Sequence, residues 1–284
     1  MKRIDTAEEL RALLAEWHPE GDRIALVPTM GNLHKGHLSL VELAKENAER
    51  VIVSVFVNPT QFAPDEDYER YPRTLDKDAL RLSRAGADVL FAPAAEVIYP
   101  NGIAQATTVT VPDLSAELEG ESRPGHFAGV TSVVCRLFNI CHPNLAVFGQ
   151  KDFQQYVILK RMVKDLHLPV QLIAGPTARD NNGLALSSRN GFLNKDQQIN
   201  AAVIYQALCA VTTMLEDGDR DFTALEHSAA EQIAAAGLEP DYISVRDADD
   251  LSLPSEGSTH LVVLAAACCG TVRLIDNVVV ELPV

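Results

Sequence analysis

The first 175 residues alternate between short runs of consecutive apolar residues and longer amphipathic stretches. The apolar runs predict strands over Ile24–Val27, Val51–Val57, Val89–Phe91, Leu145–Phe148 and Val170–Ile173. The stretches between them predict helices over His37–Arg50, Thr74–Ala85, Gly129–Asn139 and Phe153–Leu166, and the charged opening MKRIDTAEELRALLAEW is also helix-like. Consecutive apolar positions suit strands that are covered on both faces. Strand–helix alternation favours right-handed crossovers, so residues 1–175 are expected to form a Rossmann-like, doubly wound parallel α/β domain.

The pattern changes after Gly175-Pro176. Two helices are predicted first, over Lys195–Asp217 and Phe222–Ala236. Three strands are predicted after them, over Tyr242–Arg246, His260–Ala267 and Val272–Val280. Consecutive helices followed by consecutive strands are typical of an α+β unit, so residues 176–284 are expected to form a smaller C-terminal α+β domain.

Composition narrows the class of protein and its partners. With 47% hydrophobic residues among 284, the chain can form a real core, and its 24 basic and 39 acidic side chains give a net charge of −15. Such a charge disfavours nucleic acid and anionic membranes as partners. The five cysteines show no CxxC spacing, which indicates reduced thiols. The longest apolar run, Leu261–Cys269, is too short to span a bilayer, and the opening lacks a signal-peptide pattern, so a soluble cytoplasmic protein is expected.

The loop that follows the first predicted strand carries the most informative chemistry. It reads PTMGNLHKGH from Pro28 to His37. Gly31 and Gly36 allow a ligand to approach the backbone, and a helix start offers N–H donors with about half a positive charge. His34 and His37 can point the same way and hold a phosphate. Surface decoration or metal binding are the alternatives, but no third metal ligand is near in sequence.

Three common motifs are missing at this loop. The turn shows no GxGxxG pattern, which weakens a dinucleotide-binding interpretation. Neither a Walker A lysine pattern nor a GxSxG elbow is found, so P-loop and α/β-hydrolase chemistry are unsupported.

Two further segments carry cationic side chains near predicted element ends. FGQKDFQQ, from Phe148 to Gln155, follows a strand and opens a helix, so Lys151 would lie at the same sheet edge as the histidines. An ordinary strand–helix turn is the alternative, with Asp152 favoured by the helix dipole. GLALSSRN, from Gly183 to Asn190, offers two hydroxyls and a guanidinium for a polyphosphate, although its composition is also that of an ordinary loop. A hinge near Gly175 would let this loop close over a ligand.

Uncharged and acidic segments complete the candidates. In NPTQF, Gln61 could bind a carboxylate or hydroxyl substrate, as could Gln155, and solvated amides are an equal alternative for both. The acidic run Asp65-Glu66-Asp67 is interpreted as solvated surface, with a magnesium role unsupported. Arg123, His126 and the Cys141-His142 pair are too isolated in sequence for a site, although RPGH resembles a turn near a ligand.

Taken together, these segments resemble one family. PTMGNLHKGH, NPTQF, RPGHF, FGQKDFQQ and GLALSSRN, in this order, closely resemble the pantothenate synthetase (pantoate–β-alanine ligase) family, and RLIDN near the C-terminus also fits. The His34-x-x-His37 loop resembles the HxGH signature of nucleotidyl transferases related to class I aminoacyl-tRNA synthetases. Ser187-Ser188-Arg189 resembles their KMSKS-type loop.

The resemblance implies an ATP-dependent ligase of pantothenate and coenzyme A biosynthesis that works in two half-reactions. The carboxylate of (R)-pantoate first attacks the α-phosphate of ATP and gives pantoyl adenylate and pyrophosphate. The amine of β-alanine then attacks the activated carbonyl and releases pantothenate and AMP. The resemblance also implies Mg²⁺ with the ATP, a homodimer formed through the first domain, and a C-terminal domain that acts as a lid.

The resemblance also implies a set of site residues. The catalytic residues would be His34, His37, Lys151 and Arg189. The ATP-binding residues would be Met30, Gly31, Asn32, Leu33, His34, Lys35, Gly36, His37, Gly149, Gln150, Lys151, Asp152, Ala178, Leu186, Ser187, Ser188 and Arg189. Gln61 and Gln155 match the family's pantoate-binding glutamines, and Gln61 also meets β-alanine in this interpretation. Ala178 stands where the family is expected to have Val, at a backbone contact that should tolerate the change.

Two other functions remain open at this point. One is an adenylyltransferase of the same superfamily that transfers AMP to a phosphate-bearing acceptor and stops there. The uncharged Gln61 and Gln155 favour a small carboxylate or hydroxyl acceptor instead. The other is a nucleotide-binding module without catalysis. The role of His37 also stays open between proton donor and electrostatic stabiliser of the α-phosphate.

Overall fold

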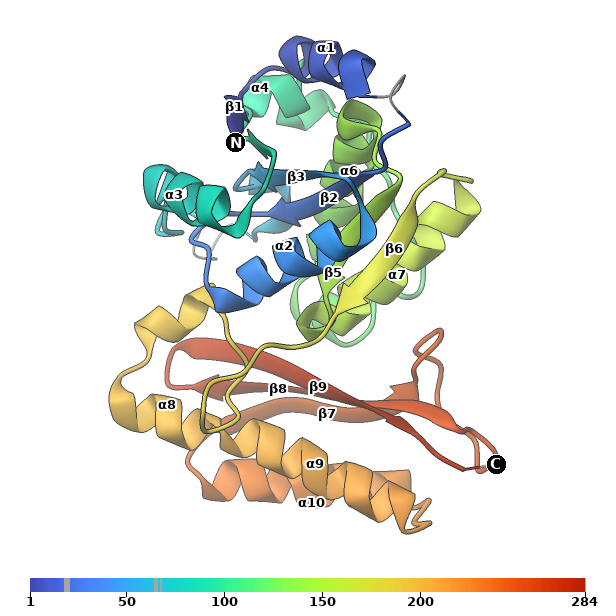
Figure 1. The fold of residues 1–284 in the computed structure, drawn as a ribbon. Helices are drawn as coiled ribbons and strands as arrows, with labels where there is room; N and C mark the ends of the chain where they lie inside the picture. The colour runs from blue at the N-terminus through green and yellow to red at the C-terminus, as the bar shows by residue number, and fades with distance from the viewer. Residues whose placement is uncertain (18–20, 64–65, 67, 284) are drawn as a thin grey trace. The chain divides into compact units, whose positions relative to one another are not determined.

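The structure is a computed structural model that describes residues 1–17, 21–63, 66 and 68–283. The chain folds into two compact units (Figure 1). The N-terminal unit comprises residues 1–149 and 154–175, and the C-terminal unit comprises residues 150–153 and 176–284. The short segment 150–153 therefore belongs to the C-terminal unit, although it follows a strand of the N-terminal unit in sequence.

The N-terminal unit is built on a six-stranded sheet in the order β1-β4-β3-β2-β5-β6, and every neighbouring pair is parallel. Its strands are β1 (Lys2–Ile4), β2 (Ile24–Thr29), β3 (Arg50–Val55), β4 (Val89–Phe91), β5 (Leu145–Gly149) and β6 (Gln171–Gly175). The predicted doubly wound parallel sheet is confirmed. Each predicted strand is present within two residues of its expected bounds.

The consecutive apolar runs are explained by helices on both faces of this sheet (Figure 1). In β2, Ile24 and Leu26 belong to one buried cluster, whereas Ala25 and Val27 belong to another. Because successive side chains of a strand point to opposite faces, a strand covered on both sides needs apolar residues at every position. The first cluster includes residues of helices α1 (Ala7–Trp17), α6 (His126–Cys141) and α7 (Phe153–Asp165), and the second includes residues of α2 (Lys35–Asn47) and α3 (Leu75–Ala85).

The predicted helices of this unit are present in the expected order, together with two short helices that were not predicted, over Ala95–Ile98 and Glu119–Ser122. They are α1 (Ala7–Trp17), α2 (Lys35–Asn47), α3 (Leu75–Ala85), α4 (Ala95–Ile98), α5 (Glu119–Ser122), α6 (His126–Cys141) and α7 (Phe153–Asp165), with 3₁₀ turns η2 (Pro59–Gln61) and η3 (Ile103–Gln105). The helix-like interpretation of the opening is wrong for Lys2–Ile4, which pair with Val89–Phe91 as an edge strand. A strand this short has no periodicity of its own to read, and its stability comes from the pairing. Helix α6 begins three residues before the predicted start.

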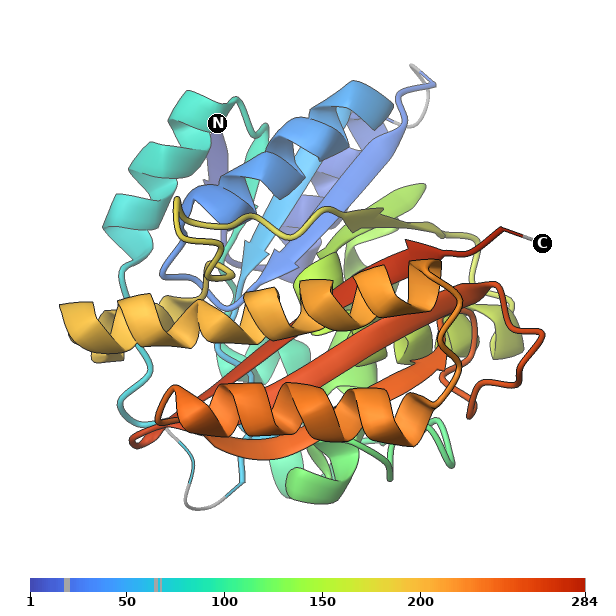
Figure 2. The ribbon, with the colours of Figure 1, turned by 90° about the horizontal axis from the view of Figure 1, so that it is seen from below.

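The C-terminal unit is a three-stranded antiparallel sheet with two helices packed on one face (Figures 1 and 2). Its elements are η4 (Gln150–Asp152), η5 (Ser188–Phe192), α8 (Lys195–Ala201), α9 (Val203–Glu216), α10 (Phe222–Ala235), β7 (Glu239–Asp247), β8 (His260–Cys269) and β9 (Val272–Glu281). The single predicted helix over Lys195–Asp217 is divided at Ala202, which keeps helical backbone angles. The predicted α+β class is confirmed.

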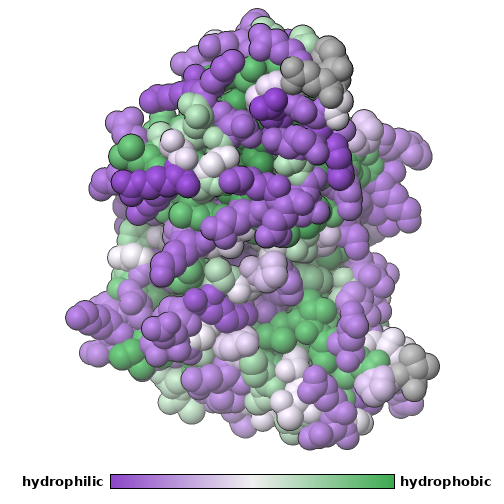
Figure 3. All heavy atoms as spheres, in the orientation of Figure 1, coloured by the Kyte–Doolittle hydropathy of each residue, from purple (hydrophilic) through white to green (hydrophobic). Residues whose placement is uncertain are grey.

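Among the described residues, one helix, Lys195–Glu216, is long and apolar enough to cross a membrane by length and composition alone. Its buried side chains Ala207, Leu208, Val211 and Leu215 belong to the core cluster of the C-terminal unit, which they share with the sheet. This helix is therefore apolar because it packs on β8 and β9. The face of the molecule in Figure 3 is mostly hydrophilic, with smaller hydrophobic areas between the polar residues.

Candidate functional site

The sheet of the N-terminal unit reverses its direction of growth between β2 and β5. From β2 the chain adds β3 and β4 on one side, and from β5 it adds β6 on the other. In open parallel sheets, ligands bind beyond the carboxyl ends of the strands at such a switch point. The loop with both histidines follows β2, and the segment with Lys151 follows β5. The two most informative motifs of the sequence thus begin at the two strands of the switch point.

A buried carboxylate holds the loop that follows β2. Asp78 of α3 is fully buried, and its two oxygens accept hydrogen bonds from the backbone N–H groups of Asn32 and Leu33, each at 2.9 Å. Thr74 Oγ1 also donates to it at 2.9 Å. Gly31 takes the left-handed conformation with φ 83°, which costs a glycine little. Asp78 therefore determines the course of the loop from 45 residues away in sequence.

This arrangement bears on which backbone groups of the loop could meet an anion. The resemblance implied that Met30 to His37 line the ATP site, and within this segment the N–H groups of Asn32 and Leu33 bind Asp78. Lys35 and Gly36 open α2, where helix N–H groups have no partner within the helix. The first-turn N–H groups that are not used within the helix therefore include those of Lys35 and Gly36.

The structure brings the two histidines together. His34 is the N-cap of α2, His37 is its third residue, and their ring centroids are 4.0 Å apart. The backbone N–H of His34 donates to Nδ1 of His37 at 3.2 Å. Because Nδ1 accepts, the proton of the neutral ring lies on Nε2. Both rings are half-buried, whereas the side chain of Lys35 is exposed. His37 can therefore present an N–H donor at the start of the helix.

Gln61 lies in η2, and its carboxamide is held at both ends. Its Oε1 accepts from Asn58 Nδ2 at 3.1 Å, and its Nε2 donates to Sδ of Met30 at 3.3 Å. Asn58 is itself buried, donates to the carbonyl of Gly129 at 3.2 Å and accepts from the hydroxyl of Tyr99 at 2.7 Å. This network links Gln61 to the histidine loop through Met30. The sequence singled out Gln61 and missed Asn58, although both belong to NPTQF.

A second network holds the backbone at Gln61. The Nδ1 of His126 donates to the carbonyl of Gln61 at 2.8 Å, and its Nε2 accepts from Arg123 at 3.1 Å. Arg123 also forms an ion pair with Glu66 at 2.6 Å. Burial and the neighbouring Arg123 charge lower the pKa of His126 to about 4, so the ring is neutral at pH 7.

Two sequence interpretations change with this network. RPGHF looked too isolated for a site, yet its Arg123 and His126 support the segment that carries Gln61. Glu66 was expected to be solvated surface, but its side chain is only 22% exposed because it pairs with Arg123. Asp65 and Asp67, the other members of the acidic run, lie outside the described residues. The pairing of Glu66 with Arg123 was hidden because the two residues are far apart in sequence.

The two adjacent glutamines of α7 have different surroundings. Gln154 is buried, donates to the carbonyls of Leu114 and Glu117 and accepts from the N–H of Glu119. Gln155, the predicted substrate ligand, is half-buried. Gln154 therefore has a structural task, and Gln155 remains the candidate for binding.

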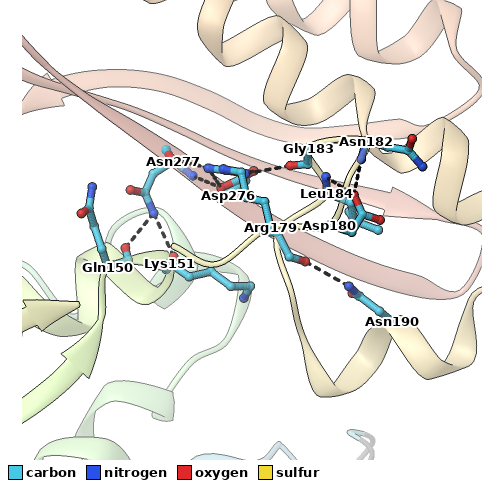
Figure 4. A network of polar contacts seen from close by, with 11 residues as sticks. Gln150, Lys151, Arg179, Asp180, Asn182, Gly183, Leu184, Asn190, Asp276 and Asn277 are labelled. Carbon is cyan, nitrogen blue, oxygen red and sulfur yellow. Dashed lines mark hydrogen bonds and ion pairs between the residues drawn. The ribbon is translucent and has the colours of Figure 1, made fainter. Parts of the chain in front are cut away.

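In the C-terminal unit, Lys151 lies in the middle of η4 (Figure 4). Its ammonium is 3.8 Å from the carboxylate of Asp152, and its side chain is 18% exposed. Asn277 of β9 donates from Nδ2 to the carbonyls of Gln150 and Lys151, both at 2.9 Å. The sequence located the lysine but not the asparagine, which belongs to RLIDN. The preceding Gly149 ends β5, where it pairs with Gly175.

The segment from Ala178 to Leu186 forms a hairpin-like loop anchored on β9 (Figure 4). The N–H of Leu186 donates to the carbonyl of Ala178 at 2.8 Å, so these two predicted ATP contacts are neighbours. Between them, Arg179 forms a two-bond ion pair with Asp276 and lies 3.6 Å from the ring centroid of Tyr205. The side chains of Arg179 and Asp276 are 16% and 4% exposed. The loop is therefore built around a largely buried ion pair.

The loop continues into the predicted Ser187-Ser188-Arg189 segment. Ser187 is the N-cap of η5, and its side chain accepts from the N–H of Arg189 at 3.2 Å. All three side chains are half-buried. Asn190, next in the chain, donates to the carbonyl of Ala185 at 3.0 Å. The structure thus places Leu186 to Arg189 on one short, well-connected turn.

Metal binding was one alternative interpretation of the two histidines. Within the part of the chain that the structure describes, no three His, Cys, Asp or Glu side chains gather closely enough to hold an ion. The structure therefore supplies no third protein ligand for the two histidines among these residues.

Comparisons with known proteins show which family the chain belongs to. The family model for pantoate-beta-alanine ligase matches residues 2–279. The pantothenate synthetase of Thioalkalivibrio sulfidiphilus is 53% identical over 283 residues, which cover 100% of this chain and 99% of the relative. The crystal structure of pantothenate synthetase from Thermus thermophilus superposes with a TM-score of 0.91 at 42% identity, covering 98% of this chain and 99% of that one.

A further solved structure contains ligands. The pantoate-beta-alanine ligase of Francisella tularensis, complexed with beta-gamma ATP and beta-alanine, is 35% identical with a TM-score of 0.82, and the match covers 98% of this chain and 97% of that one. Full-length identity, the matching family model and the shared fold agree with the resemblance of the five sequence motifs. The chain belongs to the pantoate–β-alanine ligase family, the enzymes that condense pantoate with β-alanine at the expense of ATP.

Proposed function

We propose how this ligase divides its reaction among its residues. The histidine loop, the Lys151 turn and the Ser187–Arg189 turn bind the phosphates of one ATP, while Gln61 and Gln155 bind pantoate. The observation that carries the proposal is the pair of imidazoles 4.0 Å apart at the start of α2, beyond the switch point of the sheet. Paired imidazoles and open helix N–H groups are suited to an anion, and uncharged carboxamides to a small hydroxy acid.

In the first half-reaction, a carboxylate oxygen of (R)-pantoate attacks the α-phosphorus of ATP. The bond to the bridging oxygen of the β-phosphate breaks, and its electron pair leaves with pyrophosphate. No proton is released by the attacking carboxylate. His37 and His34 therefore serve as hydrogen-bond donors to the α-phosphate, where negative charge develops, and His37 donates from Nε2. Lys151 and Arg189 offset the charge on the transferred and departing phosphates.

In the second half-reaction, the amine of β-alanine attacks the carbonyl carbon of pantoyl adenylate. The bond to the phosphate oxygen breaks, AMP leaves and the nitrogen loses a proton. Gln61 is held rigidly by Asn58 and Met30, so its amide can orient pantoate without competing electrostatically with the adenylate. Gln61 also meets the incoming β-alanine in this scheme. Gln155 completes the binding of the pantoate hydroxyls.

The remaining predicted contacts of ATP are assigned to backbone and to turn geometry. Ala178 and Leu186, joined by a hydrogen bond, offer backbone groups to the nucleotide. Gly149, Gln150 and Asp152 form the turn around Lys151, and Gly31, Asn32 and Leu33 form the loop around the histidines. The N-terminal residues 1–175 thus carry most of the ATP and pantoate contacts. Residues 176–284 act as a lid that brings Arg189 to the phosphates.

Mg²⁺ enters as part of the substrate, bound to the phosphates of ATP. Magnesium keeps several waters and needs only one or two carboxylates beside the phosphates, which suits a chain whose described residues form no three-ligand cluster. The ion would offset charge on the triphosphate. We also propose a cytoplasmic homodimer formed through the first domain, which analytical ultracentrifugation of the purified chain would test.

The reaction is tested by the pantoate-dependent exchange of pyrophosphate into ATP in the absence of β-alanine. We expect exchange with pantoate, and formation of pantothenate and AMP once β-alanine is added. An adenylyltransferase would exchange with a phosphate-bearing acceptor and not with pantoate. A nucleotide-binding module would bind ATP and show no exchange.

The roles of the donors are tested by His37→Ala and Lys151→Ala. Each should lower the rate of exchange at least ~100-fold, the scale for the loss of an electrostatic donor in the transition state. Exposed residues provide matched controls, with His227→Ala on α10 and Lys164→Ala on α7 expected to leave the rate unchanged. A near-normal rate in both site variants would contradict the proposed site.

A further inference from the structure

Two consecutive residues of β9, Asp276 and Asn277, connect to both nucleotide-binding segments of the C-terminal unit (Figure 4). Asn277 is 2% exposed, and both its N–H donors go to the η4 turn around Lys151. Asp276 is 5% exposed, and its carboxylate holds Arg179 at the base of the loop that leads to Ser187–Arg189. Asp276 and Asn277 therefore hold the η4 turn and the base of the loop that leads to Ser187–Arg189, the segments proposed to bind phosphate.

The two hydrogen bonds of Asn277 act on one residue. The carbonyl of Gln150 belongs to the peptide plane before the Cα of Lys151, and the carbonyl of Lys151 belongs to the plane after it. Each accepts from Nδ2 of Asn277 at 2.9 Å. Because a residue has only two soft backbone dihedrals, holding both planes determines the direction in which its side chain leaves the backbone. A single carboxamide thus sets the direction of the Cα–Cβ bond of Lys151 through the backbone on both sides of it.

The nitrogen of the Asn277 carboxamide makes these two bonds, whereas its oxygen lies in unfavourable surroundings. Oδ1 of Asn277 is buried and has no hydrogen-bond partner within the described residues. An unsatisfied buried oxygen is costly, and an apolar side chain of the same size would avoid that cost. Turning the amide over would set its oxygen against two carbonyls. The asparagine is therefore poorly suited to filling the core, but well suited to holding the turn.

A neutral donor is also the right chemistry beside a catalytic cation. An arginine or lysine here would repel Lys151, and a carboxylate would meet two carbonyl oxygens and attract the ammonium. An uncharged donor holds the carbonyls and adds no second carboxylate to Asp152, which already lies 3.8 Å from the ammonium.

We propose that Asn277 is a positioning residue that orients Lys151 for adenylate formation. The proposal rests on the proposed role of Lys151 in the first half-reaction. Asn277 touches no substrate in this scheme. Its contribution is the alignment of the ammonium with the developing charge on the phosphates, where a small displacement of a catalytic group lowers the rate strongly.

The test is a double-mutant cycle on the full-length enzyme, read as pantoate-dependent pyrophosphate exchange. Asn277→Leu should lower kcat at least ~10-fold, the lower end of the loss expected from misplacement of a catalytic group. The KM for pantoate should change less than about twofold, because Gln61 and Gln155 lie on the other unit. In a Lys151→Ala background, the same substitution should change kcat by less than about twofold, since two residues that act through one group are not additive.

Two further measurements separate positioning from loss of structure. Asp221→Ala removes the side-chain cap of α10 in the same unit and serves as the stability control, with exchange expected to stay unchanged. Hydrogen exchange followed by mass spectrometry should show faster exchange in Asn277→Leu for the peptide that spans residues 149–153 and unchanged protection in β7 and β8. Asn277→Asp, which keeps the size of the side chain, replaces Asn277→Leu if that variant does not fold.

The outcomes distinguish the two proposals. If Lys151→Ala exchanges at a near-normal rate, the proposed role of Lys151 fails. If Lys151→Ala is impaired but Asn277→Leu is normal, or if the two losses multiply in the double variant, Lys151 keeps its role and Asn277 is not its positioning residue.

Discussion

The histidine loop of the N-terminal unit and the Lys151 turn of the C-terminal unit are held in the same way but with opposite chemistry. Each is held from behind by one buried side chain that is distant in sequence. Asp78 accepts from two backbone N–H groups of the histidine loop, whereas Asn277 donates to two carbonyls of the Lys151 turn. The histidine loop thus has a charged support, whereas the Lys151 turn, which carries a cation, is held by an uncharged amide. The support of the Lys151 turn therefore adds no further charge beside the ammonium, which already lies 3.8 Å from the carboxylate of Asp152.

Removing Asp78, the charged support of the histidine loop, should have the largest effect on the free energy of unfolding. Asp78→Ala leaves the N–H groups of Asn32 and Leu33 and the hydroxyl of Thr74 without their acceptor. Because bonds to a charged group are strong and the site is buried, we expect a loss of roughly 4 kcal/mol in the free energy of unfolding. Urea denaturation measures it, and Asp76→Ala on the same helix is the control. Asp76 is 97% exposed, so a comparable loss in both variants would contradict a special role for Asp78.

In the C-terminal unit, the Arg179–Asp276 ion pair supports the Ala178–Leu186 loop. Asp276→Ala leaves Arg179 largely buried without its carboxylate and should cost roughly 3 kcal/mol in the free energy of unfolding. The more exposed Arg273–Asp241 pair joins β9 to β7 and provides the control. Asp241→Ala should cost about 1 kcal/mol or less. Equal losses of unfolding free energy for the two variants in urea denaturation would show that burial of the Arg179–Asp276 pair does not increase its contribution to stability.

Local sequence patterns predicted most of the fold because its strands and helices are long enough to show a period. β2, for example, has apolar residues at four consecutive positions, and the structure covers both of its faces. β1 was missed because Lys2–Ile4 are three residues whose strand conformation depends on pairing with β4. Periodicity describes the chain locally and contains no information on such a pairing.

The site shows the same division between local and distant information. His34 and His37 are three residues apart, so their proximity could be predicted from helical spacing. Asp78 and Asn277 could not be selected in this way, because each acts on a backbone segment that only the tertiary fold brings to it. The groups that could carry chemistry were visible in the sequence, whereas the residues that orient them were not.

A smaller loss of stability is expected at the close contact between the backbones of Gly129 and the Thr60–Gln61 segment. Helix α6 approaches η2 at Gly129, where an added Cβ would overlap the carbonyl of Thr60 and lie 2.7 Å from the N–H nitrogen of Gln61. Gly129→Ala should therefore displace η2, cost roughly 2 kcal/mol in the free energy of unfolding and raise the KM for pantoate. Gly257→Ala, whose Cβ has only a serine hydroxyl at 4.0 Å, is the control. An unchanged KM in Gly129→Ala would separate Gln61 from pantoate binding.

The smallest effect concerns the pH dependence of the free energy of unfolding. It arises from His126, the neutral side chain that supports the backbone of Gln61. The folded pKa of His126 is about 4, below its ordinary 6.5, because burial and Arg123 disfavour the imidazolium. Between pH 6.5 and pH 4 the unfolded chain therefore binds a proton that the folded chain does not. The stabilisation is fully present above pH 6.5 and is lost as the pH falls towards 4, by less than about 2 kcal/mol between pH 7 and pH 5.

His126→Asn keeps a donor for the Gln61 carbonyl without a titrating ring, so its unfolding free energy should depend less on pH in this window. Equal pH dependence in the two proteins would show that His126 is not held neutral by the fold, whereas a shallower slope in the variant would assign this part of the acid sensitivity to the support of Gln61.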